Sequence, residues 1–526
     1  MKPTLVVATI VLAIVTAAAN LYASLRTGYS FPMAPLAAIV AGLVLRGDAR
    51  SRAAIVAVAA GASAAGYVPG GGNVPSLVAL ASTVETLSRG GWVLWFVFVS
   101  LLGLFAAAWL GAPKHLAFPT AKATADIADA MDGEAGRIDP AGRAKTRGLL
   151  LGMVGGAFIA LLHAVRVLPS RLALPGRLGI ELSALAFGIG PYVGVRVAAS
   201  MAFAGAFTAA LVAPRLVSAG LVTDPSWAGV VRFMLWPALG MVTTSACLAH
   251  ALEWKAAKTG RTTASATKAS VARALLPVVA ITLALRVVFG VPWLAALATG
   301  PVTLLTILAS IRAMGETDAV PVKALAPLTQ VVAGITAPSS FVSAAIMPDV
   351  ACAAGLSAAD TATSLRTGGD ARSILLLRAL GIVVGAATTV VCLPWIIPRP
   401  ELFAPTEALP APSIVLWKST AEVLSHGLAA VPTSARLALV LGAVVGAVLV
   451  LVERAVPPKK RMWLPSAVGL GGALVLPASL STTIFAGALV GAMAKRRWSP
   501  ELVGLVGAGA VAGESVASVL AALLGR

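Results

Sequence analysis

FPTAKATADIADAMDG, residues 118–133, is a short polar stretch inside a very apolar chain. Lys122 and Asp126 stand four residues apart in it, so on a helix both charges lie on one face. The pattern returns later, where KATADI at 122–127 is matched by KSTAEV at 418–423. An ionisable side chain at mid-depth in lipid costs at least ~2.5–3.5 kcal/mol, so we expect both copies to face protein or water. Two matched polar helices indicate a site where two related halves meet.

The composition of the chain is that of a membrane protein. Of its 526 residues, 58% are hydrophobic and 12% are charged, and the mean hydropathy is +0.92, whereas soluble domains carry about 25% charged residues. Apolar runs of spanning or near-spanning length predict an all-α polytopic membrane protein with about 16 transmembrane helices. The runs PGGGNVP (69–75) and FGIGPYVG (187–194) are expected to interrupt helices beside a cavity, because broken backbone in a bilayer needs protein or water around it. The alternative is that their glycines and prolines serve close packing and kinks.

The charge of the chain is strongly positive, at +19. Lys and Arg lie mainly in short loops, where they orient helices and meet anionic headgroups, so membrane lipids rather than nucleic acid are the expected partners. The first 24 residues resemble a signal peptide, but their apolar run continues into the next motif and is interpreted as the first transmembrane helix. We expect a multi-pass protein of the cytoplasmic (inner) membrane, and the sequence leaves room for an oligomer.

Metal and cofactor chemistry has little support in the sequence. The three cysteines are scattered without a CxxC pair, and the four histidines show no ligand spacing and no HExxH motif. A Walker A lysine loop is also absent from the sequence, so ATP is not expected to drive the protein directly. We therefore predict no metal site made by the protein and no cofactor.

An internal repeat extends well beyond the opening pair of motifs. LSRGG at 87–91 resembles LRTGG at 365–369, and FAGA occurs at 203–206 and again at 485–488. The matches keep their order at an offset of 278 to 296 residues, which predicts two repeated halves. One integral domain over 1–526 is expected, with half 1 at about 1–252, a connector helix at about 274–290 and half 2 at about 291–526. The uneven loop charges favour inverted halves.

Six segments carry distinctive motifs, namely NLYASLRTGYSF (20–31), LAFPTAKATADI (116–127), GIGPYVGVRVA (188–198), GETDAVPVKALAPLTQ (315–330), DTATSLRTG (360–368) and GAGAVAGES (507–515). These segments resemble motifs of the oligopeptide transporter (OPT) family, whose plant relatives include the yellow-stripe-like metal-chelate carriers. The most specific is GETD followed by P-x-x-A-L and T-Q. The resemblance implies a proton-coupled secondary transporter that moves small peptides into the cytoplasm. Uptake of metal–siderophore-like chelates is the alternative that it leaves open.

Two departures from the family motifs add cations. Lys122 stands where the family's F-P run has glycine, and Lys323 lies in VPVKA where the family has N-P-x-G-A. Both favour a ligand with free carboxylates. With them, the candidates for substrate binding are Lys122, Lys418, Arg196 and Lys323 for carboxylates, and Asn20, Tyr22, Thr27 and Gln330 for neutral hydrogen bonds. The alternative for Arg196 is a snorkelling or ion-paired arginine, and the alternative for Asn20 and Tyr22 is an anchor at the membrane interface.

Proton coupling requires an acid that is neutral in one state and charged in another, as happens when a carboxyl moves between dry and wet surroundings. Glu316 and Asp318 form the densest pair and lead, and Asp126 and Glu422 follow through the repeat. The acids in or beside apolar runs are Glu85, Asp126, Glu181, Glu316, Asp318, Asp349, Asp360, Glu422 and Glu514. The alternative for each acid is a structural ion pair, such as Asp126 with Lys122.

An enzyme is the distant alternative. Asp126, Asp129 and Asp132 follow one another at i, i+3 steps, a spacing with which a membrane prenyl transferase holds Mg²⁺ on a lipid diphosphate. That chemistry needs a second acidic cluster across a cavity, and the repeat supplies only Glu422 there. We therefore expect a transporter and no catalytic residues.

Overall fold

The computed structural model describes most of the chain. The described residues are 2–27, 33–45, 51–70, 73–81, 88–113, 116, 118–132, 140–175, 178–259, 268–317, 341–407, 409–415, 417 and 432–524. Nearly all of them are helical, and the expected all-α polytopic class is confirmed.

The region before the predicted connector begins with α1 (Pro3–Thr27), α2 (Ala34–Val44), α3 (Arg52–Gly70), α4 (Asn73–Ala81), α5 (Arg89–Leu110), α6 (Pro119–Asp132) and α7 (Pro140–Ala164). It continues with a hairpin of β1 (Arg171–Leu174) and β2 (Leu178–Glu181), then α8 (Ala184–Val193), α9 (Val195–Phe207), a π-helical turn (Thr208–Val212), α10 (Ala213–Ser218) and α11 (Trp227–Thr259).

The later region contains α12 (Lys268–Val287), α13 (Trp293–Thr317), α15 (Phe341–Thr367) and α16 (Ala371–Ile396), and a short 3₁₀ turn (Pro400–Leu402). After these come α18 (Thr433–Ala455), a second 3₁₀ segment (Pro458–Trp463), α19 (Ala467–Ala473), α20 (Ala478–Ala494) and α21 (Pro500–Leu523). Helix α12 overlaps the predicted connector, and the connector role itself stays a prediction.

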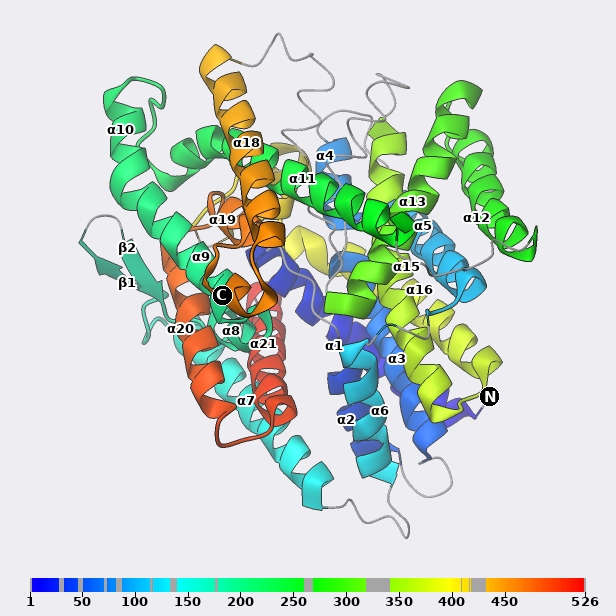
Figure 1. The fold of residues 1–526 in the computed structure, drawn as a ribbon. Coiled ribbons are helices and arrows are strands. Elements are labelled where there is room, and N and C mark those ends of the chain that lie inside the picture. The colour runs from blue at the N-terminus through cyan, green and yellow to red at the C-terminus, as the bar shows by residue number, and fades with distance from the viewer. Residues whose placement is uncertain are drawn as a thin grey trace.

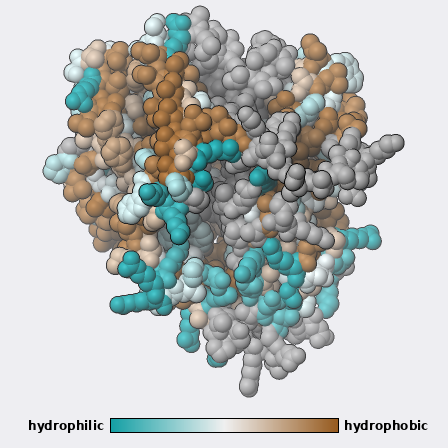
Figure 2. Space-filling view, in the orientation of Figure 1, coloured by the Kyte–Doolittle hydropathy of each residue, from teal (hydrophilic) through white to brown (hydrophobic). Residues whose placement is uncertain are grey.

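The surface of the molecule is apolar over the outer helices. Nine helices among the described residues are long and apolar enough to cross a membrane. Helix α18 is the most exposed of them, because only 17% of its apolar 18-residue stretch is buried within the protein. Figure 2 shows a hydrophobic column where α18 lies in Figure 1, with hydrophilic residues gathered lower on the same face. The chain is a multi-pass membrane protein; the number of its crossings stays a prediction.

Glycines let distant helices approach one another closely. In α7 and α21, which lie side by side (Figure 1), a Cβ added at Gly156 would overlap the Ala510 carbonyl, and one at Gly513 would overlap the Met153 carbonyl. Small residues four apart bring helix backbones together in membranes, where packing and not the hydrophobic effect holds helices. The same kind of contact joins α3 to α16, α8 to α20 and α11 to α18. Each pair therefore joins the region before the connector to the region after it.

The packing also has a reciprocal pattern. Helix α1 packs on α3, and α13 packs on α15; α3 packs on α16, and α15 packs on α5. These are the contacts that a two-fold repeat requires if α1, α3 and α5 correspond to α13, α15 and α16. The two-half organisation stays a prediction that this packing supports.

The helix break predicted within 187–194 is present and lies at Gly194. Helix α8 runs through Pro191 as far as Val193, and Gly194, with φ of +80°, separates it from α9. Pro191 has no N–H for the Phe187 carbonyl, and Gly487 of α20 approaches that carbonyl instead. In the other predicted break, α3 ends at Gly70 and α4 begins at Asn73. The sequence did not predict the β1–β2 hairpin.

Candidate functional site

Residues Pro119–Asp132 of the polar stretch form α6, which lies against α2, α3 and α15. This helix, α6, starts at Pro119, whose missing N–H suits a first helical position. Its Lys122 is exposed and its Asp126 is half-buried. Asp129, near the C-terminal end of α6, pairs with Arg52 Nε of α3 at 2.6 Å. The repeat partners Lys418 and Glu422 lie outside the described residues, so the shared site stays a prediction.

The predicted polar residues of α1 bind neighbouring parts of the protein. Asn20 Nδ2 donates to the Gly66 carbonyl at 2.9 Å, and Thr16 Oγ1 donates to the Ala62 carbonyl at 2.6 Å, so this face of α1 is hydrogen-bonded to α3. Thr27 Oγ1 donates to the Ala23 carbonyl within α1. The Tyr22 hydroxyl accepts a hydrogen bond from Arg26 at 3.1 Å. These contacts position α1, and the substrate role of Asn20, Tyr22 and Thr27 stays a prediction.

Arg196 follows the break at Gly194 and joins α9 to the later region. Its Nη1 pairs with Glu453 of α18 at 2.7 Å, and its Nε donates to the Leu464 carbonyl at 2.9 Å. In this structure the guanidinium therefore binds a carboxylate of the protein.

The remaining predicted residues lie outside what the structure describes. Glu316 belongs to the last turn of α13, but the position of its side chain is not described. Asp318, Lys323, Gln330, Lys418 and Glu422 lie entirely outside the described residues.

A buried charged cluster joins α3, α15 and α16. The Tyr67 hydroxyl donates to Asp360 Oδ2 at 2.6 Å and accepts a hydrogen bond from Ser63 at 2.7 Å. Arg378 Nε lies 3.8 Å from the same Asp360 oxygen, and Arg378 Nη2 donates to the Ser357 carbonyl at 2.9 Å. Asp360 and Arg378 are each only 2% exposed. An acid this deep can hold a charge because a cation and a hydroxyl lie beside it.

A second buried cluster surrounds β2 and the start of α8. Arg26 of α1 forms an ion pair with Glu181. The Glu181 N–H donates to Thr483 Oγ1, which in turn donates to the Glu181 carbonyl. Glu514 of α21 accepts a hydrogen bond from Ser183 at 2.8 Å and one from the Leu185 N–H at 2.9 Å. Its carboxylate thus caps the N-terminus of α8, where negative charge is stabilised.

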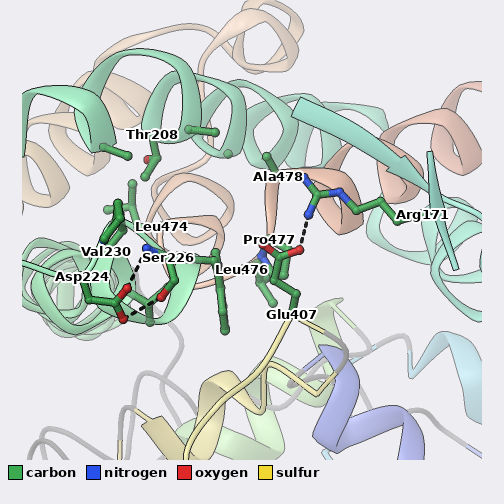
Figure 3. A pocket seen from close by; sticks show the side chains of 16 residues that line it. Arg171, Thr208, Asp224, Ser226, Val230, Glu407, Leu474, Leu476, Pro477 and Ala478 are labelled. Atoms are coloured by element: carbon green, nitrogen blue, oxygen red, sulfur yellow. Dashed lines mark hydrogen bonds and ion pairs between the residues drawn. The ribbon is translucent and has the colours of Figure 1, made fainter. Parts of the chain in front are cut away.

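A cavity of about 510 Å³ lies between α9, α11 and α20 (Figure 3), and its lining contains no residue of either cluster. Its lining contains none of the described residues that the sequence singled out. The wall comes from both regions of the chain, namely Arg171, Gly205, Thr208, Ala209, Ala213, Asp224, Pro225, Ser226, Trp227, Val230, Val231, Glu407, Leu474, Leu476, Pro477 and Ala478.

Sequence reasoning missed several members of these sites. Arg378 had a detectable signal, because a cation inside the apolar run SILLLRALGIVV costs free energy unless it has a partner. Tyr67 and Thr208 had none, since a tyrosine or threonine in an apolar helix is ordinary. Asp360 and Glu514 were among the nine candidate acids but were not placed first.

The comparisons with known proteins identify one family. Residues 268–524 match the family model described as OPT oligopeptide transporter protein. A search of curated proteins found no match to the chain. The later region therefore carries an OPT family domain, as the motifs in it indicated, and this supports a transporter of oligopeptide-type substrates.

Proposed function

Because residues 268–524 carry an OPT oligopeptide transporter domain, we propose that the chain is a proton-coupled secondary transporter. It would import small oligopeptides or peptide-like substrates across the cytoplasmic membrane and catalyse no reaction. The observation that carries the proposal is the family match, and the nine helices among the described residues that are apolar and long enough to cross a membrane agree with it.

Buried acids support the coupling to protons. Asp360 is 2% exposed, inside a protein whose outer helices are apolar, and its carboxylate lies beside Arg378. A carboxyl in such a place changes its proton affinity when a conformational change admits water or removes its cation. A transporter that alternates its access provides that change, so acids of this kind can load and release a proton in each cycle.

The experiment that tests this function uses the full chain in proteoliposomes. A labelled tripeptide should accumulate above its outside concentration only when an inward proton gradient is imposed, and a protonophore should abolish the accumulation. A ferric siderophore chelate added in parallel tests the alternative cargo. Accumulation of the chelate without the peptide would refute peptide import, and release of diphosphate from a lipid diphosphate without any gradient would show an enzyme.

Glu316→Gln is expected to abolish gradient-driven accumulation while counterflow exchange of the peptide continues. The amide keeps the size of the side chain but carries no titratable proton, so the substrate still crosses without coupling. Glu501→Gln is the control, because Glu501 is exposed and pairs only loosely with Lys145, at 3.7 Å. Full accumulation in the Glu316 variant would remove this residue from the coupling role.

Lys122→Ala is expected to raise the KM for an acidic peptide about fivefold and to leave the KM for a neutral peptide nearly unchanged. The lost attraction between two charges about 4 Å apart in water is about 1 kcal/mol. Lys460→Ala, at an exposed lysine far along the chain, should leave both values unchanged. An equal loss for both peptides would mean that Lys122 serves the structure of α6.

A further inference from the structure

The cavity beside α9 contains polar groups whose hydrogen bonds are not made. Thr208 is 8% exposed, and its Oγ1 has no hydrogen-bond partner among the described residues. Trp227 Nε1 is likewise buried and unpartnered within the described part of the chain. Figure 3 shows the Thr208 side chain extending from its helix toward the cavity. A buried donor without an acceptor costs about 1–3 kcal/mol, and no described residue supplies an acceptor to either group.

The helix that carries Thr208 is irregular at this point. The turn Thr208–Val212 is π-helical, with the Ala213 N–H bonded to the Thr208 carbonyl, and Pro214 follows directly. Such turns widen a helix and are frequent at functional sites. Here the turn carries Thr208 and Ala209 into the lining of the cavity.

A helix N-terminus also lines the cavity. Helix α20 begins after Pro477, and no described side chain caps its first turn. Its Ala478 lies close to α9, since a Cβ added at Gly205 would be 3.1 Å from the Ala478 Cα. The free N–H groups and the partial positive charge of a helix N-terminus attract anions. With Thr208 and Trp227, α20 therefore makes this part of the cavity suitable for a carboxylate.

The rim of the cavity has the opposite character. Asp224 accepts hydrogen bonds from Ser226 N at 2.9 Å and Ser226 Oγ at 2.7 Å, and these bonds lower the pKa of its carboxyl, which stays ionised. On the other side, Glu407 pairs with Arg171 (Figure 3). The two carboxylates and one guanidinium leave the rim with a net negative charge, which favours a cation and disfavours a ligand that is only an anion.

We propose that this cavity binds a short zwitterionic peptide with apolar side chains, which would be the substrate of the proposed transporter. The peptide carboxylate would bind Thr208 Oγ1, Trp227 Nε1 and the N-terminus of α20, and its ammonium group would lie near Asp224. The apolar side chains would pack on Val230, Leu474 and Leu476, which line the space between. A cavity of about 510 Å³ lies within the range of about 300–1,000 Å³ that small ligands occupy.

Binding is measured on the purified full chain in nanodiscs without any gradient, with labelled tri-alanine as the probe. We expect wild type to bind tri-alanine and to bind the N-acetylated and C-amidated forms at least about tenfold more weakly. Thr208→Val removes the hydroxyl at constant shape and should weaken binding about tenfold. Trp227→Phe should act in the same direction. Thr388→Val is the matched control, because the Thr388 hydroxyl bonds its own helix at the Val384 carbonyl.

A second variant tests the space rather than the hydrogen bonds. Ala209→Leu fills the cavity and should abolish binding of tri-alanine. Ala210→Leu is its neighbour in the same turn, is exposed and does not line the cavity, so it should bind as wild type does. Size-exclusion profiles of the two variants should be the same, which separates lost binding from lost folding.

Three results would overturn this assignment. The first is unchanged binding in both Thr208→Val and Ala209→Leu, and the second is equal binding of tri-alanine and its blocked forms. The third is that oleate displaces tri-alanine and its terminally blocked forms equally well, which would identify a lipid site. If wild type and the Thr208→Val and Ala209→Leu variants all accumulate tri-alanine equally under a proton gradient, the cavity assignment fails and the proposed function stands. If wild type binds tri-alanine in this cavity but never accumulates it, the cavity assignment stands and the proposed function fails.

Discussion

Gly156→Val is expected to prevent α7 and α21 from packing and to cost at least about 3 kcal/mol, the upper end for overpacking. A Cβ at Gly156 would overlap the Ala510 carbonyl and lie 2.9 Å from the Glu514 N. Both are backbone atoms of a helix, so they cannot turn aside as a side chain would. The helices must separate, and the Glu514 carboxylate that caps α8 moves with α21. The measurement is the thermal unfolding midpoint of the purified protein in detergent, with the folded yield.

The adjacent glycine provides the control for this result. Gly155 is exposed, and a Cβ there has nothing within 4 Å. Gly155→Val puts the same side chain at the same depth of the same helix, so it shares any change in helix propensity. We expect its midpoint to stay within a few degrees of wild type. Equal losses in both variants would show that propensity, and not the approach of α7 to α21, explains the effect.

Arg378→Met is expected to destabilise the protein by about 3–5 kcal/mol, the usual cost of removing one partner from a buried ion pair. It leaves the Asp360 carboxylate 2% exposed with the Tyr67 hydroxyl as its donor and without its cation. Methionine keeps much of the length of arginine, so the loss reflects charge more than volume. Chemical unfolding of the purified variant in detergent measures it.

A double variant distinguishes charge from packing at this cluster. Asp360→Leu combined with Arg378→Met removes both charges and should recover most of the stability lost in Arg378→Met, since buried pairs exchange for apolar residues at little cost. Arg372→Met, at an exposed arginine of the same helix, should be nearly neutral. A double variant no more stable than Arg378→Met alone would contradict an electrostatic origin of the loss.

The fold class was accessible from the sequence because the bilayer imposes a simple rule. A helix must satisfy its backbone polar groups internally and present about 20 apolar residues, so spanning segments such as Pro3–Thr27 and Arg89–Leu110 are visible as apolar runs. The β1–β2 hairpin was missed, since strands of four residues carry too short a pattern to detect. The break predicted within 187–194 is present at Gly194, while the glycine and proline residues at 188–191 continue α8 because a neighbouring backbone approaches them.

The candidate site was predicted only in part. Polar residues in apolar helices were correctly singled out as costly, and Asp360 and Glu514 are indeed buried with partners. Arg378 lies on the helix that follows Asp360 in the chain, but the other partners are reached across about 150 to 330 residues, as in Arg26–Glu181 and Ser183–Glu514. A single sequence contains no local signal for such pairs. Thr208 was missed because its role depends on its position in the wall of the cavity, which a single sequence does not show.

The sequence by itself determined that this chain is an α-helical membrane protein with OPT motifs, because apolar length and motif order are properties of the chain alone. Only the tertiary structure decided which helices meet, which acids are buried and where an unfilled cavity lies. The physical reason is that close approach in a membrane depends on glycines facing a particular neighbour. Gly155 and Gly156 are both glycines and cannot be told apart in the sequence. Only the position of α21 makes Gly156 necessary for the packing.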